Sequence, residues 1–212
     1  MRLPGQGWTD LVASFLGMWA AMTAAMMLPS LVPVLRRYRR SVGAAAPSRL
    51  GGLIARVGAG YFLVWVALGV AILPLGLALA QAGFHMPAWA RAVPLLAGVA
   101  VLLAGGLQLT AWKARRLACC RTVPVHDQEL SATAAAAWRL GLRLGSHCIA
   151  CCAPLMGALL VAGVMDLRAM AAATLAITAE RLAPAAEAVA RAIGVLMVAA
   201  GMLLLVRAAR LP

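Results

Sequence analysis

The segment HCIACCAPLM, residues 147–156, groups residue types that bind soft metals. It contains three of the five cysteines of the chain, one of its histidines and a methionine. On a helix, His147 and Cys151 lie one turn apart, and Cys148, Cys152 and Met156 form a second row at the same spacing. Thiolate, imidazole and thioether select Cu(I), zinc or iron–sulfur over magnesium or calcium. Cysteine also packs as a small hydrophobe, but four such residues within six positions favour a metal or redox site.

Further donors lie outside this segment. Met22 and Met26 are four residues apart in an apolar stretch, so they share one face of a helix. Such a methionine row is more often packing than ligation. Cys119 and Cys120 lie in a polar stretch, and Glu180 ends a short apolar one. These five residues complete the set of candidate metal ligands.

The composition indicates that these residues belong to a membrane protein. The chain is 64% hydrophobic and 12% charged, with a mean hydropathy of +0.93. A transmembrane helix needs about 20 apolar residues to cross roughly 30 Å of hydrocarbon. We therefore expect an all-α, polytopic membrane helical bundle that forms a single integral membrane domain over residues 1–212. About six transmembrane helices are predicted, over residues 11–35, 57–80, 93–112, 144–164, 169–182 and 188–206.

Two polar features accompany these predicted spans. Gln108 lies in apolar surroundings, so its side chain needs a hydrogen-bond partner. The run from Ser131 to Leu144 is predicted to form an amphipathic helix on the membrane surface, ahead of the span that carries the cysteines.

The net charge of +13 would suit a nucleic-acid-binding protein, but the arginines lie mainly between the apolar runs. This distribution is typical of topogenic signals, with the lipid bilayer as the partner. Aromatic residues of the kind that stack on bases are not interleaved with the arginines, so no nucleic-acid partner is expected. The positive-inside rule places the loops 36–56 and 113–143 in the cytoplasm and the N-terminus outside. We predict a multi-pass protein of the bacterial inner (cytoplasmic) membrane, with its cysteines near the cytoplasmic leaflet.

Motifs spread along the chain resemble those of one family. Residues 19–29 match W-x-x-M-x-x-A-M-M-x-P, and residues 141–152 match G-x-x-x-G-x-x-C-x-x-C-C. Further matching segments are Gln108–Thr110 with Lys113, Leu155–Met156, Gly163–Met165 and Glu180–Pro184. On these motifs the chain resembles the DUF2182 family, which is described as predicted metal-binding integral membrane proteins of bacteria. The resemblance implies a metal site in the membrane.

The chain departs from this family at two places. The family usually has cysteines three and seven residues after the lysine, where this chain has Arg116 and Cys120. The resemblance therefore implies either that the neighbouring Cys119 replaces one ligand or that one ligand is missing. Residue 153 is alanine, where the family often has tryptophan.

Three functions fit these residues. The first is the binding, delivery or transport of a soft transition metal, with copper favoured because cysteine and methionine suit Cu(I). Zinc is the alternative metal, since three cysteines and a histidine form a common zinc set. No G-x-x-x-x-G-K-[ST] motif for ATP is present. The expected partners are a metal chaperone or another membrane protein, or a second copy of the chain.

The second function is a membrane thiol–disulfide protein that uses Cys148 and Cys151, because a C-x-x-C motif at a helix start makes a thiol reactive. Placement near the reducing cytosol counts against this function. The third is a structural or assembly subunit in which the cysteines only pack. The first and third functions are not enzymatic, and no catalytic residue is predicted.

Overall fold

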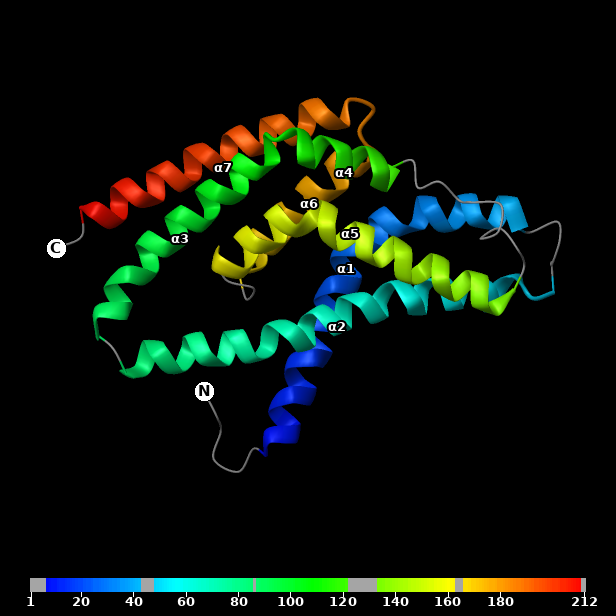
Figure 1. Ribbon diagram of the computed structural model, residues 1–212, viewed down its shortest axis with the longest axis horizontal. Coiled ribbons are helices and arrows are strands. Elements are labelled where there is room, and N and C mark those ends of the chain that lie inside the picture. The colour runs from blue at the N-terminus through cyan, green and yellow to red at the C-terminus, as the bar shows by residue number, and fades with distance from the viewer. Residues whose placement is uncertain (1–6, 43–47, 86, 122–132, 163–165, 211–212) are drawn as a thin grey trace. The chain divides into compact units, whose positions relative to one another are not determined.

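The computed structural model describes residues 7–42, 48–85, 87–121, 133–162 and 166–210. The predicted motif segment Gly163–Met165, and Ser131 at the start of the predicted amphipathic helix, lie outside these residues. Within the described ranges the chain forms seven helices (Figure 1). They are α1 (Trp8–Val42), α2 (Leu50–His85), α3 (Pro87–Gln108), α4 (Ala111–Arg121), α5 (Ala134–Ala162), α6 (Leu167–Leu182) and α7 (Ala186–Ala209). The predicted all-α class is confirmed.

Helix length and hydropathy make this a multi-pass membrane protein. Four helical segments are long and apolar enough to cross a membrane: Val12–Val42, Leu50–Ala78, Ala134–Val161 and Ala186–Ala209. A fifth candidate is the pair Ala92–Gln108 and Ala111–Arg121, which is bent by 66° and counts as one broken span. The described residues thus contain four or five candidate spans, where the sequence predicted about six.

The bent pair of α3 and α4 separates the counts of four and five, and the short α6 accounts for the sixth predicted span. The predicted span 169–182 is helical, but α6 has 16 residues and is about 24 Å long, which is less than the hydrocarbon thickness. The predicted span 144–164 begins earlier, because α5 already starts at Ala134. The alanine-rich run that opens α5 favours helix, so the predicted surface helix is the first part of α5.

The chain divides into two compact units. Unit 1 contains Met1–Leu77 and Val125–Ser146, and unit 2 contains Ala78–Pro124 and His147–Pro212. Each unit has its own helix packing. The prediction of a single integral membrane domain stays a prediction.

In unit 1, glycines allow α1, α2 and the first part of α5 to pack closely. The Trp19 indole Nε1 of α1 donates to the Trp65 carbonyl of α2 over 2.8 Å. A Cβ on Gly69 would lie 2.6 Å from the Trp19 ring. A Cβ on Gly141 of α5 would collide with the Val57 carbonyl of α2. Helices gain no hydrophobic driving force by associating in lipid, so small residues that let the backbones pack closely stabilise their contact.

In unit 2, α3 and α7 pack as an antiparallel pair along most of their length (Figure 1). Gly98 of α3 faces Leu205 of α7. Gly105 lies two turns further along α3 and faces Val198, which lies two turns earlier along α7. A Cβ on Gly105 would lie 2.7 Å from the Val198 backbone nitrogen, and a Cβ on Gly201 would lie 2.7 Å from that of Leu102. These distances leave no room for a methyl group. We call this contact the glycine seam.

The break between α3 and α4 sets the direction of α4. Thr110 Oγ1 donates to the Leu107 carbonyl, which closes α3, and accepts from the Lys113 backbone nitrogen at 3.4 Å. A threonine that accepts from the third residue of a helix is an N-cap. The cap begins α4 in a new direction, and it places Lys113 and Leu117 on the buried side of that helix.

Candidate metal site

A network of buried polar groups positions α4 inside unit 2. Lys113 Nζ lies 2.7 Å from Glu180 Oε2 of α6, and the two side chains are 0% and 2% exposed. Gln108 Nε2 of α3 donates to Glu180 Oε1 over 2.5 Å. Lys113 Nζ also donates to the Cys151 carbonyl of α5 over 2.7 Å. The expected partner of Gln108 is therefore Glu180, and four helices meet at this network.

The network has two consequences for metal binding. Both carboxylate oxygens of Glu180 are engaged by Lys113 and Gln108, so this side chain acts here as an ion-pair partner. Lys113 also fixes the backbone of α5 at the centre of the cysteine segment. A buried charge is stable when it is paired and hydrogen-bonded, and here each charged group has both.

Lys113 ties the first turn of α4 to α5, and the last turn of α4 contacts α5 through two cysteines. Cys119 Sγ lies 3.7 Å from His147 Nδ1, and Cys120 Sγ donates to the His147 carbonyl over 3.1 Å. The three side chains are partly exposed. Thiol and imidazole at this distance are both able to bind one soft cation after small side-chain rotations.

A row of thiols continues from Cys120 into the interior. Cys120 packs against the cluster that contains Cys151, the two thiols interact, and Cys151 also interacts with the adjacent Cys152. Cys152 Sγ lies 3.9 Å from Cys148 Sγ, one helical turn away. We call Cys120, Cys151, Cys152 and Cys148 the thiol row. Four soft donors from two helices thus follow one another without a gap.

Both apolar residues and a cation lie beside the thiol row. Cys120 packs against a hydrophobic cluster made of Leu117, Cys151, Ala186 and Ala190. Arg181 Nη2 lies 3.8 Å from Cys120 Sγ. A guanidinium at this distance places a positive charge beside the thiol row.

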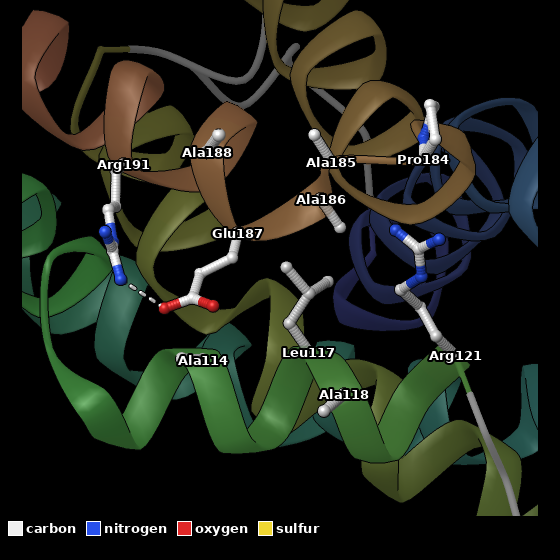
Figure 2. Close-up of a pocket in the computed structure, with 10 residues that line it drawn as sticks. All are labelled: Ala114, Leu117, Ala118, Arg121, Pro184, Ala185, Ala186, Glu187, Ala188 and Arg191. Carbon is white, nitrogen blue, oxygen red and sulfur yellow. Dashed lines mark hydrogen bonds and ion pairs between the residues drawn. The ribbon is translucent and has the colours of Figure 1, made fainter.

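A surface pocket borders this cluster. It has a volume of about 590 Å³ and lies between α4 and the start of α7 (Figure 2). Leu117 and Ala186 line the pocket and also belong to the cluster around Cys151. Figure 2 shows the ion pair of Arg191 and Glu187 on one side of it. The pocket and the thiol row therefore border the same hydrophobic cluster.

The ten predicted site residues divide between the two units. His147 and all five cysteines lie in unit 2 and are linked by the contacts above, and Met156 is buried in the same unit. Met22 and Met26 are buried in unit 1, so their participation in the site stays a prediction. In the described part of the chain, no group of three His, Cys, Asp or Glu side chains is arranged to hold a metal ion. The donors occur instead as neighbouring pairs.

Sequence reasoning missed the roles of Lys113 and Arg181. Lys113 entered only as part of a family motif, and Arg181 only within the matching segment Glu180–Pro184. One signal could have revealed the first role: Gln108 and Glu180, placed near apolar segments, each require a polar partner. Lys113, five residues after Gln108, was the nearest cation in the sequence.

The fold and the thiol row define a multi-pass membrane protein with clustered soft donors. Its family follows from comparison with known proteins. Residues 16–204 match the family described as "PpoB2: Copper chaperone", so the chain belongs to the PpoB2 copper chaperone family. No match was found among curated proteins or among solved structures.

Proposed function

We propose that this protein is a membrane copper chaperone that binds Cu(I) at the thiol row and passes it to another protein. The observation that carries this proposal is the unbroken sequence of thiol contacts from Cys120 to Cys148. Cu(I) is the cargo whose ligand preference matches thiolates. The family description supports copper over other soft metals. On this proposal, the DUF2182 resemblance describes the same group of proteins.

The pairwise arrangement of donors also supports copper as a cargo. Structural zinc sites are closed tetrahedral sets of four ligands. Cu(I) accepts fewer ligands, so neighbouring pairs such as Cys148 and Cys152 are sufficient to bind it. A protein that has to release its cation again benefits from several adjacent sites that each bind the cation with moderate affinity.

The arginines support a location in the bacterial inner membrane with the thiol row near the cytoplasm. Arg36, Arg37, Arg39 and Arg40 end α1, and Arg115, Arg116 and Arg121 lie on α4. The positive-inside rule assigns such clusters to the cytoplasmic face. Reporter fusions at Ser48 and Arg121 should both give the cytoplasmic signal, and a periplasmic signal at both positions would reverse this orientation.

The copper proposal is tested by competition for Cu(I). Purified full-length protein, kept anaerobic, is titrated against Cu(I) held by bicinchoninate. We expect the parent protein to remove copper from the dye and the Cys148/Cys151/Cys152→Ser variant to bind at least tenfold more weakly. The matched control is Ala153→Ser, which adds a hydroxyl at an exposed position of α5 and should behave like the parent.

Three results would contradict the proposal. Uptake of zinc but not Cu(I) would make this a zinc protein. Binding of neither metal would favour packing cysteines in a structural subunit. A Cys148–Cys151 disulfide recovered from cells in the metal-free protein would favour thiol–disulfide chemistry.

A further inference from the structure

The soft donors of unit 2 fall into two groups by exposure. Cys119, Cys120 and His147 are partly exposed. Cys148, Cys151 and Cys152 are between 1% and 2% exposed. We call the pair Cys119 and His147 the outer pair, and the three buried cysteines the inner thiols. A metal ion in solvent therefore meets the partly exposed donors before the inner thiols.

Cys120 contacts both the outer pair and the inner thiols. Its Sγ donates to the backbone carbonyl of His147, which places it beside the outer pair. Its side chain also packs against the cluster that contains Cys151, one of the inner thiols, and interacts with that thiol. The lysine network holds this position, because Lys113 ties α4 to the Cys151 carbonyl.

We propose that Cys120 transfers Cu(I) from the outer pair to the inner thiols, so that copper is loaded in one order. This inference rests on the proposed function and adds a direction to it. Along α5 the path runs from His147 to Met156, which are nine positions apart and so about 14 Å apart along the helix axis. Met156 is 5% exposed and continues the row of Cys148 and Cys152, so it is the last soft donor on this face.

The transfer is a ligand exchange without a change in oxidation state. Copper stays Cu(I) throughout. A bond from copper to the Cys120 thiolate forms as the bond to His147 breaks, and a bond to Cys151 forms as the bond to Cys119 breaks. The proton that Cys120 gives up passes to the His147 imidazole as copper leaves it, and the proton that Cys151 gives up passes to the Cys119 thiolate. Two protons therefore move outward as copper moves inward, and the total charge of the site is unchanged.

Arg181 stabilises the intermediate of this exchange. Copper held by two thiolates carries one negative charge, and a charge in a poorly solvated site needs a partner. Arg181 Nη2, 3.8 Å from Cys120 Sγ, supplies a positive charge at the transfer point. The guanidinium keeps its charge at all relevant pH values.

Time-resolved X-ray absorption of the parent protein tests the order directly. Full-length protein in detergent is mixed with less than one equivalent of Cu(I) from bicinchoninate and frozen at increasing times. We expect mixed nitrogen and sulfur ligation in the earliest samples and sulfur-only ligation later. Sulfur-only ligation from the first sample onward would overturn the proposal.

The variant Cys120→Ser tests the transfer point. We expect the sulfur-only signal to appear at least tenfold more slowly than in the parent, while its final amplitude after long incubation is similar. Ala118→Ser is the matched control, since it places the same hydroxyl at an exposed position of α4, and it should load at the parental rate. Loading of Cys120→Ser at the parental rate would overturn the role of Cys120.

These outcomes separate the transfer path from the copper function itself. If the parent protein takes no Cu(I) from the dye, the proposed function is wrong and the path falls with it. If the parent binds Cu(I) at the inner thiols but both time courses lack the expected order, only the path is wrong. The parent measurement needs no substitution, so a folding defect in Cys120→Ser leaves the path testable.

Discussion

Lys113 Nζ and Glu180 Oε2 lie 2.7 Å apart in a part of unit 2 where neither side chain is more than 2% exposed. Removing two charges from solvent costs several kcal/mol per ion, and mutual attraction offsets this only with further hydrogen bonds. Gln108 and the Cys151 carbonyl supply those bonds. The pair therefore specifies where α4 lies against α5 and α6, and with it the position of Cys119 and Cys120.

We expect Glu180→Gln to destabilise the protein by about 3–5 kcal/mol, because it leaves the Lys113 ammonium buried without a carboxylate. The double variant Lys113→Met, Glu180→Leu should recover most of this loss. The measurement is the free energy of unfolding in mixed micelles. Arg191→Gln is the control, since it breaks the exposed Glu187–Arg191 pair and should cost about 1 kcal/mol or less. A double variant as unstable as Glu180→Gln would contradict the pairing.

The glycine seam makes a second prediction. Gly105→Ala should cost about 1–3 kcal/mol, because its methyl group would meet the α7 backbone. Gly106→Ala is the matched control: nothing lies within 4 Å of a Cβ there, and alanine favours helix by up to about 1 kcal/mol. Thermal unfolding of the two variants gives the comparison. Equal melting temperatures would show that α3 and α7 can separate without cost.

The methionine row of α1 is tested by Met22→Leu with Met26→Leu. The two substitutions preserve volume and apolarity, so the loss of stability should stay below about 1.5 kcal/mol. If the thioethers complete the copper site, Cu(I) affinity falls markedly, whereas zinc binding changes little because zinc rarely uses thioether. Met202→Leu, at an exposed methionine of α7, is the control. Parental copper affinity in the double variant would assign the row to packing.

Copper affinity should depend on pH. Thiols are mostly protonated at neutral pH and must lose the proton to bind a metal, so affinity falls as pH falls. Two bound thiolates predict a change of roughly a hundredfold per pH unit between pH 6 and 8. Competition titrations at pH 6, 7 and 8 measure this slope. Thioethers carry no proton, so a pH-independent affinity would indicate methionine ligation and count against the thiol row.

The helical class and the cysteine segment could be predicted from the sequence, because both are local. The apolar runs define α1, α2 and α7, and the spacing of Cys148 and Cys152 brings their Sγ atoms together on one helix. Copper also followed from ligand type, and the family match agrees with it.

The place of α4 could not be predicted in the same way. Its sequence AWKARRLACCR is polar, so it resembled a loop. Lys113 is stable in a buried position because it pairs with Glu180, which lies 67 residues further along the chain. The contact between Cys120 and Cys151 depends on that burial, and no periodicity within α4 or α5 reports it. Likewise α6 has the composition of a span but not the length.

The distance in sequence between Lys113 and Glu180 also fixes an order during biosynthesis. The ribosome completes Lys113 long before it reaches Glu180, 67 residues later. At about 5–20 residues per second the delay is roughly 3–13 seconds. Throughout this interval the lysine lacks the carboxylate that it pairs with in the folded protein. The ion pair that holds α4 against α5 and α6 can therefore form only after α6 has been made.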